Sequence, residues 1–164
     1  MTRAAVLIEI EKTVLGHPYG FGAKWRGAKW PAAGAAVDCS GLQSWAMAML
    51  LDRYPVAMVQ ASAGPMPSQE FLSRFDGSWN QGALCRPVPK ALALSPIGAG
   101  LFLLLRPDST RHGHIALSLG CGKTIESRGS KGVCIVGAAE NATRWLGARA
   151  WCGKLDFLFE KVGA

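Results

Sequence analysis

The stretch Val37-Asp38-Cys39-Ser40-Gly41-Leu42 decides the fold, because it begins an amphipathic helix with a cysteine in its first turn. Asp38 is a good N-cap residue. The apolar residues that follow recur at the spacing of one helix face, at Leu42, Trp45, Ala46, Met49 and Leu50. Cys39 lies three residues before Leu42 and therefore on the same inward face. Pro55 disfavours helix at the residue before it, so we expect the helix to end near Asp52.

A cysteine at the N-terminus of a helix can act as a nucleophile. Only the thiolate is a strong nucleophile, and both a helix N-terminus and a neighbouring imidazolium lower the pKa of a thiol. Cys39 is therefore a candidate nucleophile. Taken by itself it is also compatible with a structural role, since most cysteines behave as small buried hydrophobic residues.

Helices precede strands along the chain. Periodicity and turn residues predict helices at 3–15, 38–52 and 68–75, a long surface connection at 77–96, and strands at 99–105, 113–119, 123–127, 132–136 and 151–159. This order predicts an α+β fold with an antiparallel sheet. The length of 164 residues fits a single domain spanning 1–164.

Composition, net charge and cysteine spacing indicate which partners and which kinds of site the protein can have. The chain is 49% hydrophobic and carries a net charge of +7, which suits a folded protein with an anionic partner. The basic residues are dispersed and accompany no nucleic-acid-binding motif, so we expect no nucleic-acid partner. No apolar run is long enough to be a transmembrane segment. The five cysteines are scattered, which matches neither a complete disulfide framework nor a zinc site.

A histidine that could take the proton of the Cys39 thiol lies in the segment Arg111-His112-Gly113-His114, at the start of a predicted strand. His112 and His114 share a strand face unless Gly113 introduces a bulge. His114 lies deeper in the strand, where packing fixes a side chain better, and is the stronger candidate.

A third group follows from hairpin geometry around Gly120-Cys121-Gly122. A two-residue turn at 121–122 puts His114 and Glu126 on opposite faces. A three-residue loop over 120–122 makes them diagonal neighbours on one face, where the carboxylate can accept a hydrogen bond from Nδ1–H of the imidazole. Glu126 is therefore a candidate orienting residue that requires an odd-length loop. Alternatively, it is a charged residue on a solvent-facing strand edge.

These motifs, in this order, resemble the NlpC/P60 family of cysteine peptidases. The resemblance rests on Asp38-Cys39-Ser40-Gly41-Leu42, His114-Ile115-Ala116-Leu117-Ser118-Leu119-Gly120 and Lys123-Thr124-Ile125-Glu126. Upstream, Leu15-Gly16-His17-Pro18-Tyr19-Gly20-Phe21-Gly22 is similar to the family's Gly-x-Pro-Tyr-x-aromatic-Gly segment.

The resemblance implies a papain-like core, with a nucleophile-bearing helix packed on an antiparallel sheet. It implies hydrolysis of amide bonds in bacterial peptidoglycan peptides, commonly between D-γ-glutamate and a diamino acid, with no metal or other cofactor. Cys39 would be the nucleophile, His114 the general base and acid, and Glu126 the orienting residue. Tyr19 matches a tyrosine near the nucleophile, and Asp38 and Ser40 match positions that shape the substrate pocket.

Two departures leave a second hypothesis open. The third position, often histidine in the family, is Glu126, and the segment before Cys39 carries two Ala-Lys-Trp units at 23–25 and 28–30. The chain is thus also compatible with a catalytically silent wall-binding or structural module of the same fold. Alternatively, the tryptophans simply pack on the domain, which we favour.

Residues 1–12 lack the pattern of a secretory signal. We therefore expect synthesis in the cytoplasm and delivery to the cell wall or periplasm by another route, as for a secretion-system effector or a phage lytic or tail enzyme. An immunity or delivery protein is the partner that such a role implies.

Overall fold

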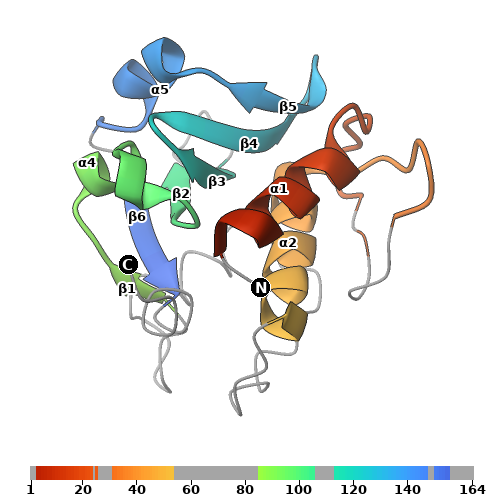
Figure 1. Ribbon diagram of the computed structural model, residues 1–164. Helices are drawn as coiled ribbons and strands as arrows, with labels where there is room; N and C mark the ends of the chain where they lie inside the picture. Colours follow the sequence, from red (N-terminus) through yellow and green to blue (C-terminus); the bar gives the residue numbers. More distant parts are fainter. Residues whose placement is uncertain are drawn as a thin grey trace, which may run out of the picture.

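The computed structural model describes residues 3–23, 25, 31–53, 85–105, 113–147 and 150–155. Within them, six strands form one antiparallel sheet in the order β1-β6-β2-β3-β4-β5 (Figure 1). The helical elements are α1 (Arg3–Val14), α2 (Cys39–Arg53), α4 (Lys90–Ala93), the 3-10 turn η1 (Pro96–Gly98) and α5 (Ala138–Arg144). The strands are β1 (Cys85–Pro87), β2 (Phe102–Leu105), β3 (His114–Gly120), β4 (Lys123–Arg128), β5 (Gly132–Val136) and β6 (Ala150–Leu155).

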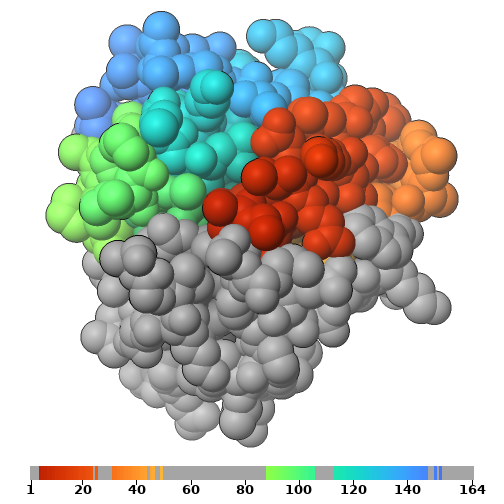
Figure 2. All heavy atoms as spheres, viewed as in Figure 1, coloured from red at the N-terminus to blue at the C-terminus, as the bar shows by residue number. Residues whose placement is uncertain are grey.

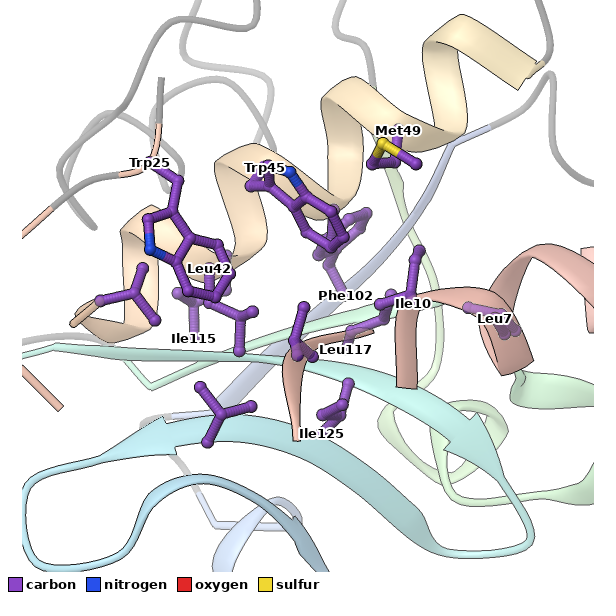
Figure 3. Packing of buried hydrophobic residues seen from close by; sticks show 14 of the residues in the cluster. Leu7, Ile10, Trp25, Leu42, Trp45, Met49, Phe102, Ile115, Leu117 and Ile125 are labelled. Carbon is purple, nitrogen blue, oxygen red and sulfur yellow. The ribbon is translucent and has the colours of Figure 1, made fainter. Parts of the chain in front are cut away.

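One face of the sheet packs against α1 and α2 (Figures 1 and 3). Four residues of the predicted α2 face are buried: Leu42, Trp45, Ala46 and Met49. They meet alternate residues of the central strands, which are Phe102, Leu104, Ile115, Leu117 and Ile125. Fully burying one such side chain contributes about 1.5–3 kcal/mol, so this layer fixes where α2 lies on the sheet.

The opposite face carries a second cluster, to which the intervening strand residues contribute. Leu103 of β2 and Ala116 of β3 belong to the same buried cluster as Trp145, at the C-cap of α5, and Ala93 of α4. Figure 1 shows α5 beside β4, across the sheet from α1 and α2. Side chains from two helical layers can therefore meet at one end of the central strands.

The sequence-based elements are confirmed over most of the described chain. The first two predicted helices correspond to α1 and α2, and four predicted strands to β2, β3, β4 and β5, each within a few residues. The predicted strand at 151–159 begins as β6, and residues 156–159 lie outside the described residues, as does the predicted helix at 68–75. The connection at 77–96 is wrong where it is described, because residues 85–87 form β1 and residues 90–93 form α4. Helix α5 was not predicted.

Among the described residues, no helix is long and apolar enough to cross a membrane. Cys39, Cys121, Cys134 and Cys152 are free thiols. Figure 2 shows α1, the β3–β4 region and α5 as one continuous surface on the viewed side.

Candidate active site

Asp38 caps α2 and thereby presents Cys39 at the helix N-terminus. The Asp38 carboxylate accepts hydrogen bonds from the Gly41 N–H at 2.7 Å and from the Ser40 hydroxyl at 3.2 Å. Its carbonyl oxygen accepts the first helical bond, from Leu42 N–H at 3.0 Å. The predicted N-cap is therefore confirmed. The thiol of Cys39 is half-buried against the core, on the predicted inward side of the helix.

Two polar contacts fasten the start of α2 to β4. The Ser127 hydroxyl donates to the carbonyl of Val37 at 2.6 Å, and the Gln43 amide donates to the carbonyl of Ile125 at 3.2 Å. These side chains are fully buried. Because both contacts flank Glu126 in sequence, they fix the distance between the helix N-terminus and this part of the sheet.

The β3–β4 hairpin has the predicted register, but its turn is shorter than predicted and a β-bulge makes up the difference. Leu117 pairs with Ile125 and Ser118 with Thr124, which is the register that the three-residue loop would give. The turn itself has only two residues, since Gly120 pairs with Lys123. A bulge at Leu119 supplies the odd residue instead.

Glycines make this turn possible. Cys121 and Gly122 have φ of +50° and +77°, as a tight hairpin turn requires. A Cβ atom on Gly122 would lie 2.6 Å from Cβ of Ala138, the first residue of α5. The turn is therefore close-packed against the helix that completes the site.

His114 and Glu126 are brought together as the register requires. Nε2 of His114 lies 2.7 Å from Oε2 of Glu126, which is fully buried. The alternative of an exposed edge carboxylate is thus wrong. The prediction that Nδ1 meets the carboxylate is also wrong, because the imidazole presents its far nitrogen to Glu126. Nδ1 is then the nitrogen left for the thiol.

Cys39 and His114 form a hydrogen-bonded pair whose protonation is shifted. Burial raises the pKa of Cys39, but the hydrogen bond to His114, the imidazolium charge and the Ile115 N–H together bring that pKa below its usual value. Burial lowers the pKa of His114, but hydrogen bonds to Cys39 and Glu126 together bring it above its usual value. Both shifts favour a thiolate beside an imidazolium.

Glu126 lies in a fully satisfied buried site. Besides His114, its carboxylate accepts hydrogen bonds from the hydroxyl of Thr124 at 2.6 Å and from Nη1 of Arg144 at 2.7 Å. Burial raises the pKa of Glu126, but His114, Arg144 and Thr124 outweigh burial and lower it to about 2. The carboxylate is therefore ionised near neutral pH and acts as a fixed acceptor.

Helix α5 and its C-cap cover this carboxylate. The buried Trp145 ring stacks on His114 with centroids 6.2 Å apart and planes 29° apart, and Arg144 lies 5.0 Å over the same indole. Asn141 holds the helix in place, accepting from the Trp145 indole at 2.9 Å and donating to the carbonyl of Gly122 at 2.8 Å. Asn141 also donates to the carbonyl of Val136 at 3.1 Å.

Tyr19 lies near the nucleophile, as predicted. A parallel bridge pairs it with Val37, just before the cap of α2. Burial, then the charges of Cys39 and Asp38, raise the pKa of the Tyr19 phenol. Its hydroxyl is therefore a proton donor near neutral pH. Asp38 and Ser40 are buried and bonded to each other, and their predicted part in substrate binding stays a prediction.

Of the other residues that the sequence suggested for the site, His17 and Trp25 pack within the fold. His17 interacts with the Ala35 carbonyl at 2.9 Å through Nδ1 and packs edge-on against Trp25. Trp25 is buried in the core against Trp45, which confirms the packing role for the first Ala-Lys-Trp unit. His112 and Trp30 lie outside the described residues.

Sequence reasoning missed the residues that hold Glu126. Thr124 precedes Glu126 by two positions and so shares its strand face, which was a usable signal. Arg144 and Trp145 gave no signal, because α5 has seven residues and only alanines among them are apolar. Their approach to the hairpin is set by tertiary packing.

No family model matches the sequence, and a search of curated proteins finds no significant match. Solved structures do match. The peptidoglycan hydrolase RipB from Mycobacterium tuberculosis is 22% identical, with a TM-score of 0.52 over 93% of this chain and 64% of the other. A lipoprotein-like protein of the NLP/P60 family from Staphylococcus aureus is 17% identical, with a TM-score of 0.52 over 93% of this chain and 41% of the other. The chain therefore has the α+β NlpC/P60 fold, which confirms the fold prediction.

Proposed function

We propose that this protein is a cysteine peptidase that hydrolyses amide bonds in the stem peptides of bacterial peptidoglycan. The observation that carries the proposal is the continuous hydrogen-bonded series from Cys39 through His114 to Glu126 at the N-terminus of α2. The fold supports it, since RipB, which shares that fold, is described as a peptidoglycan hydrolase.

In the first half-reaction, the Cys39 thiolate attacks the carbonyl carbon of the scissile amide. A C–S bond forms and the carbonyl oxygen becomes an oxyanion. The imidazolium of His114 gives its proton to the amide nitrogen, the C–N bond breaks and the amine leaves. The product is a thioester on Cys39 and a neutral His114.

In the second half-reaction, His114 takes a proton from water and the hydroxide adds to the thioester carbonyl. The C–S bond then breaks, releasing a carboxylic acid and restoring the thiolate–imidazolium pair. Glu126 takes no proton but keeps Nε2 occupied, so that Nδ1 faces the sulfur throughout.

Tyr19 is the proposed donor to the oxyanion. Its backbone pairs with Val37, two residues before Cys39, and its phenol stays protonated near neutral pH, as an oxyanion donor must. Asp38 and Ser40, at the start of α2, are proposed to shape the substrate pocket around the same carbonyl.

The bond proposed for cleavage joins D-γ-glutamate to the diamino acid of the stem peptide. The site of action is then the cell wall. A net charge of +7 favours encounter with an anionic wall polymer and predicts slower cleavage at high salt.

Digestion of purified muropeptides followed by mass spectrometry tests the proposal. The wild-type protein should convert them into two products whose masses add up to the substrate plus one water. Cys39→Ala should release neither product. Equal cleavage by Cys39→Ala and wild type would refute the assignment, and Cys121→Ala, which removes an exposed thiol, serves as the matched control.

Iodoacetamide separates this proposal from the catalytically silent module. The pair with His114 supports a thiolate at Cys39, so this thiol should be alkylated at pH 6 much faster than the exposed Cys121. His114→Ala should abolish the difference. A silent module predicts no preference for Cys39.

A further inference from the structure

Arg144 shares with His114 the same oxygen of Glu126. Nη1 of Arg144 and Nε2 of His114 each lie 2.7 Å from Oε2, while Oε1 accepts from Thr124. An arginine that only balanced a buried charge could do so from either oxygen. Here it holds the oxygen that orients the imidazole.

The arginine is itself held. Its guanidinium lies 5.0 Å over the ring of Trp145, and that ring is fixed by the bond of its indole N–H to Asn141. The Trp145 ring also stacks on the His114 ring, with the two ring centroids 6.2 Å apart. Arg144 and Trp145 thus fix two contacts of His114, one through the carboxylate and one through ring packing.

We propose that Arg144 is a positioning residue of the active site, which sets the protonation and orientation of the Cys39–His114 pair by holding Oε2 of Glu126. The inference rests on the proposed function, but its central readout, the reactivity of Cys39, needs no substrate. Arg144 touches neither the sulfur nor the imidazole by a hydrogen bond; it acts through Glu126.

Other charged groups act on the same atoms. Glu126 also lies within the influence of Arg128, near the end of β4, and Cys134 of β5, while Cys39 feels Asp38 and Tyr19. Arg128 is bonded to Glu140 at 2.6 Å rather than to Glu126. Among the described residues, the hydrogen bonds to Oε2 come from His114 and Arg144, and these other groups remain in place in the variants below.

The experiment measures the rate of Cys39 alkylation by iodoacetamide against pH, with labelling read by mass spectrometry. In Arg144→Gln the acid limb of this profile should move to higher pH by about half a unit to one unit, because Oε2 of Glu126 is no longer held against Nε2 and the imidazolium that favours the thiolate is less well stabilised. Arg144→Lys keeps the charge and should stay closer to wild type. Lys123→Gln removes an exposed charge from the same strand as Glu126 and should overlay the wild type.

The proposal is overturned if folded Arg144→Gln gives the wild-type alkylation profile, or if Arg144→Lys shifts as far as Arg144→Gln. Muropeptide cleavage adds a second readout, in which Arg144→Gln should lower kcat about tenfold to a hundredfold with KM changed less than about twofold. If wild-type protein cleaves no muropeptide, the proposed function fails while the alkylation profiles still decide the role of Arg144.

A double variant covers the case in which Arg144→Gln does not fold. In the Glu126→Gln background no buried carboxylate is left unpaired, so Arg144→Gln is better tolerated. There, the additional substitution should leave kcat within about twofold of Glu126→Gln alone, as expected for two residues that act as a unit. A further loss of about tenfold or more would show that Arg144 acts by another route.

Discussion

At the scale of single residues, Glu126 shows how a buried carboxylate is stabilised. It is enclosed by three donors, from β3, β4 and α5, and its pKa of about 2 lies below the usual 4.5. A carboxylate whose pKa is lowered on folding contributes stability above its unfolded pKa and loses it as the pH falls through the folded pKa.

The free energy of unfolding should therefore fall by about 3 kcal/mol as the pH drops from 4.5 to 2, on account of Glu126 alone. Urea unfolding at several pH values measures this fall. Glu126→Gln should flatten the dependence, whereas Glu140→Gln, which alters the exposed pair with Arg128, should not. Parallel curves for wild type and Glu126→Gln would contradict the prediction.

Asp38 has two roles that one substitution separates. It caps α2, and its charge raises the pKa of Cys39. Asp38→Asn keeps a capping side chain but removes the charge, so the acid limb of Cys39 alkylation should move to lower pH.

Asp38→Ala is the matched variant for capping and should cost about 1 kcal/mol in the free energy of unfolding. A limb that moves to higher pH in Asp38→Asn would show that the loss of electrostatic repulsion is not the dominant effect.

At the scale of elements, α5 depends on Asn141, whose side chain joins the helix to the hairpin turn and to the end of β5. Asn141→Ala leaves the carbonyls of Gly122 and Val136 and the Trp145 indole N–H without this partner. Buried groups left unpaired cost about 1–3 kcal/mol each, so we expect a loss of at least about 2 kcal/mol in urea unfolding.

The control for Asn141→Ala lies on the same helix. The Thr143 hydroxyl is exposed and bonds only to the carbonyl of Glu140 at 3.0 Å within α5. Thr143→Ala should change stability by less than about 0.5 kcal/mol. If the two substitutions cost the same, Asn141 is not the residue that fastens α5.

The sequence predicted the helices and strands whose own hydrophobic residues recur at a regular spacing. It did not predict features that depend on contacts between different elements. The α2 face from Leu42 to Met49 follows helical spacing, and Ile115 and Leu117 alternate as strand residues do. Cys39, His114 and Glu126 could be found because register and capping are local. Arg144 could not, since its partner is 18 residues away and its helix has no apolar stripe.

At the scale of the whole molecule, two hydrophobic layers on opposite faces of the sheet hold the site between them. Cys152 of β6 belongs to the layer of Trp145 and is 1% exposed, and burial raises its pKa to about 12. Its thiol is therefore a probe of global unfolding.

In native conditions Cys121 should react with iodoacetamide while Cys152 does not. As urea is added, labelling of Cys152 should rise with the global transition seen by circular dichroism. Labelling of Cys152 well before that transition would mean that this layer opens independently of the rest.

The bulge at Leu119 also determines which changes of chain length the hairpin tolerates. An extra residue at the tip, around 121–122, can be absorbed by a longer turn. One residue added or removed between His114 and Ser118 inverts the face of everything before it and turns His114 away from Glu126, whereas two residues restore the face. The segment therefore tolerates an even number of inserted or deleted residues but not an odd number. Among natural variants of this hairpin, we expect insertions and deletions inside β3 to involve two residues at a time.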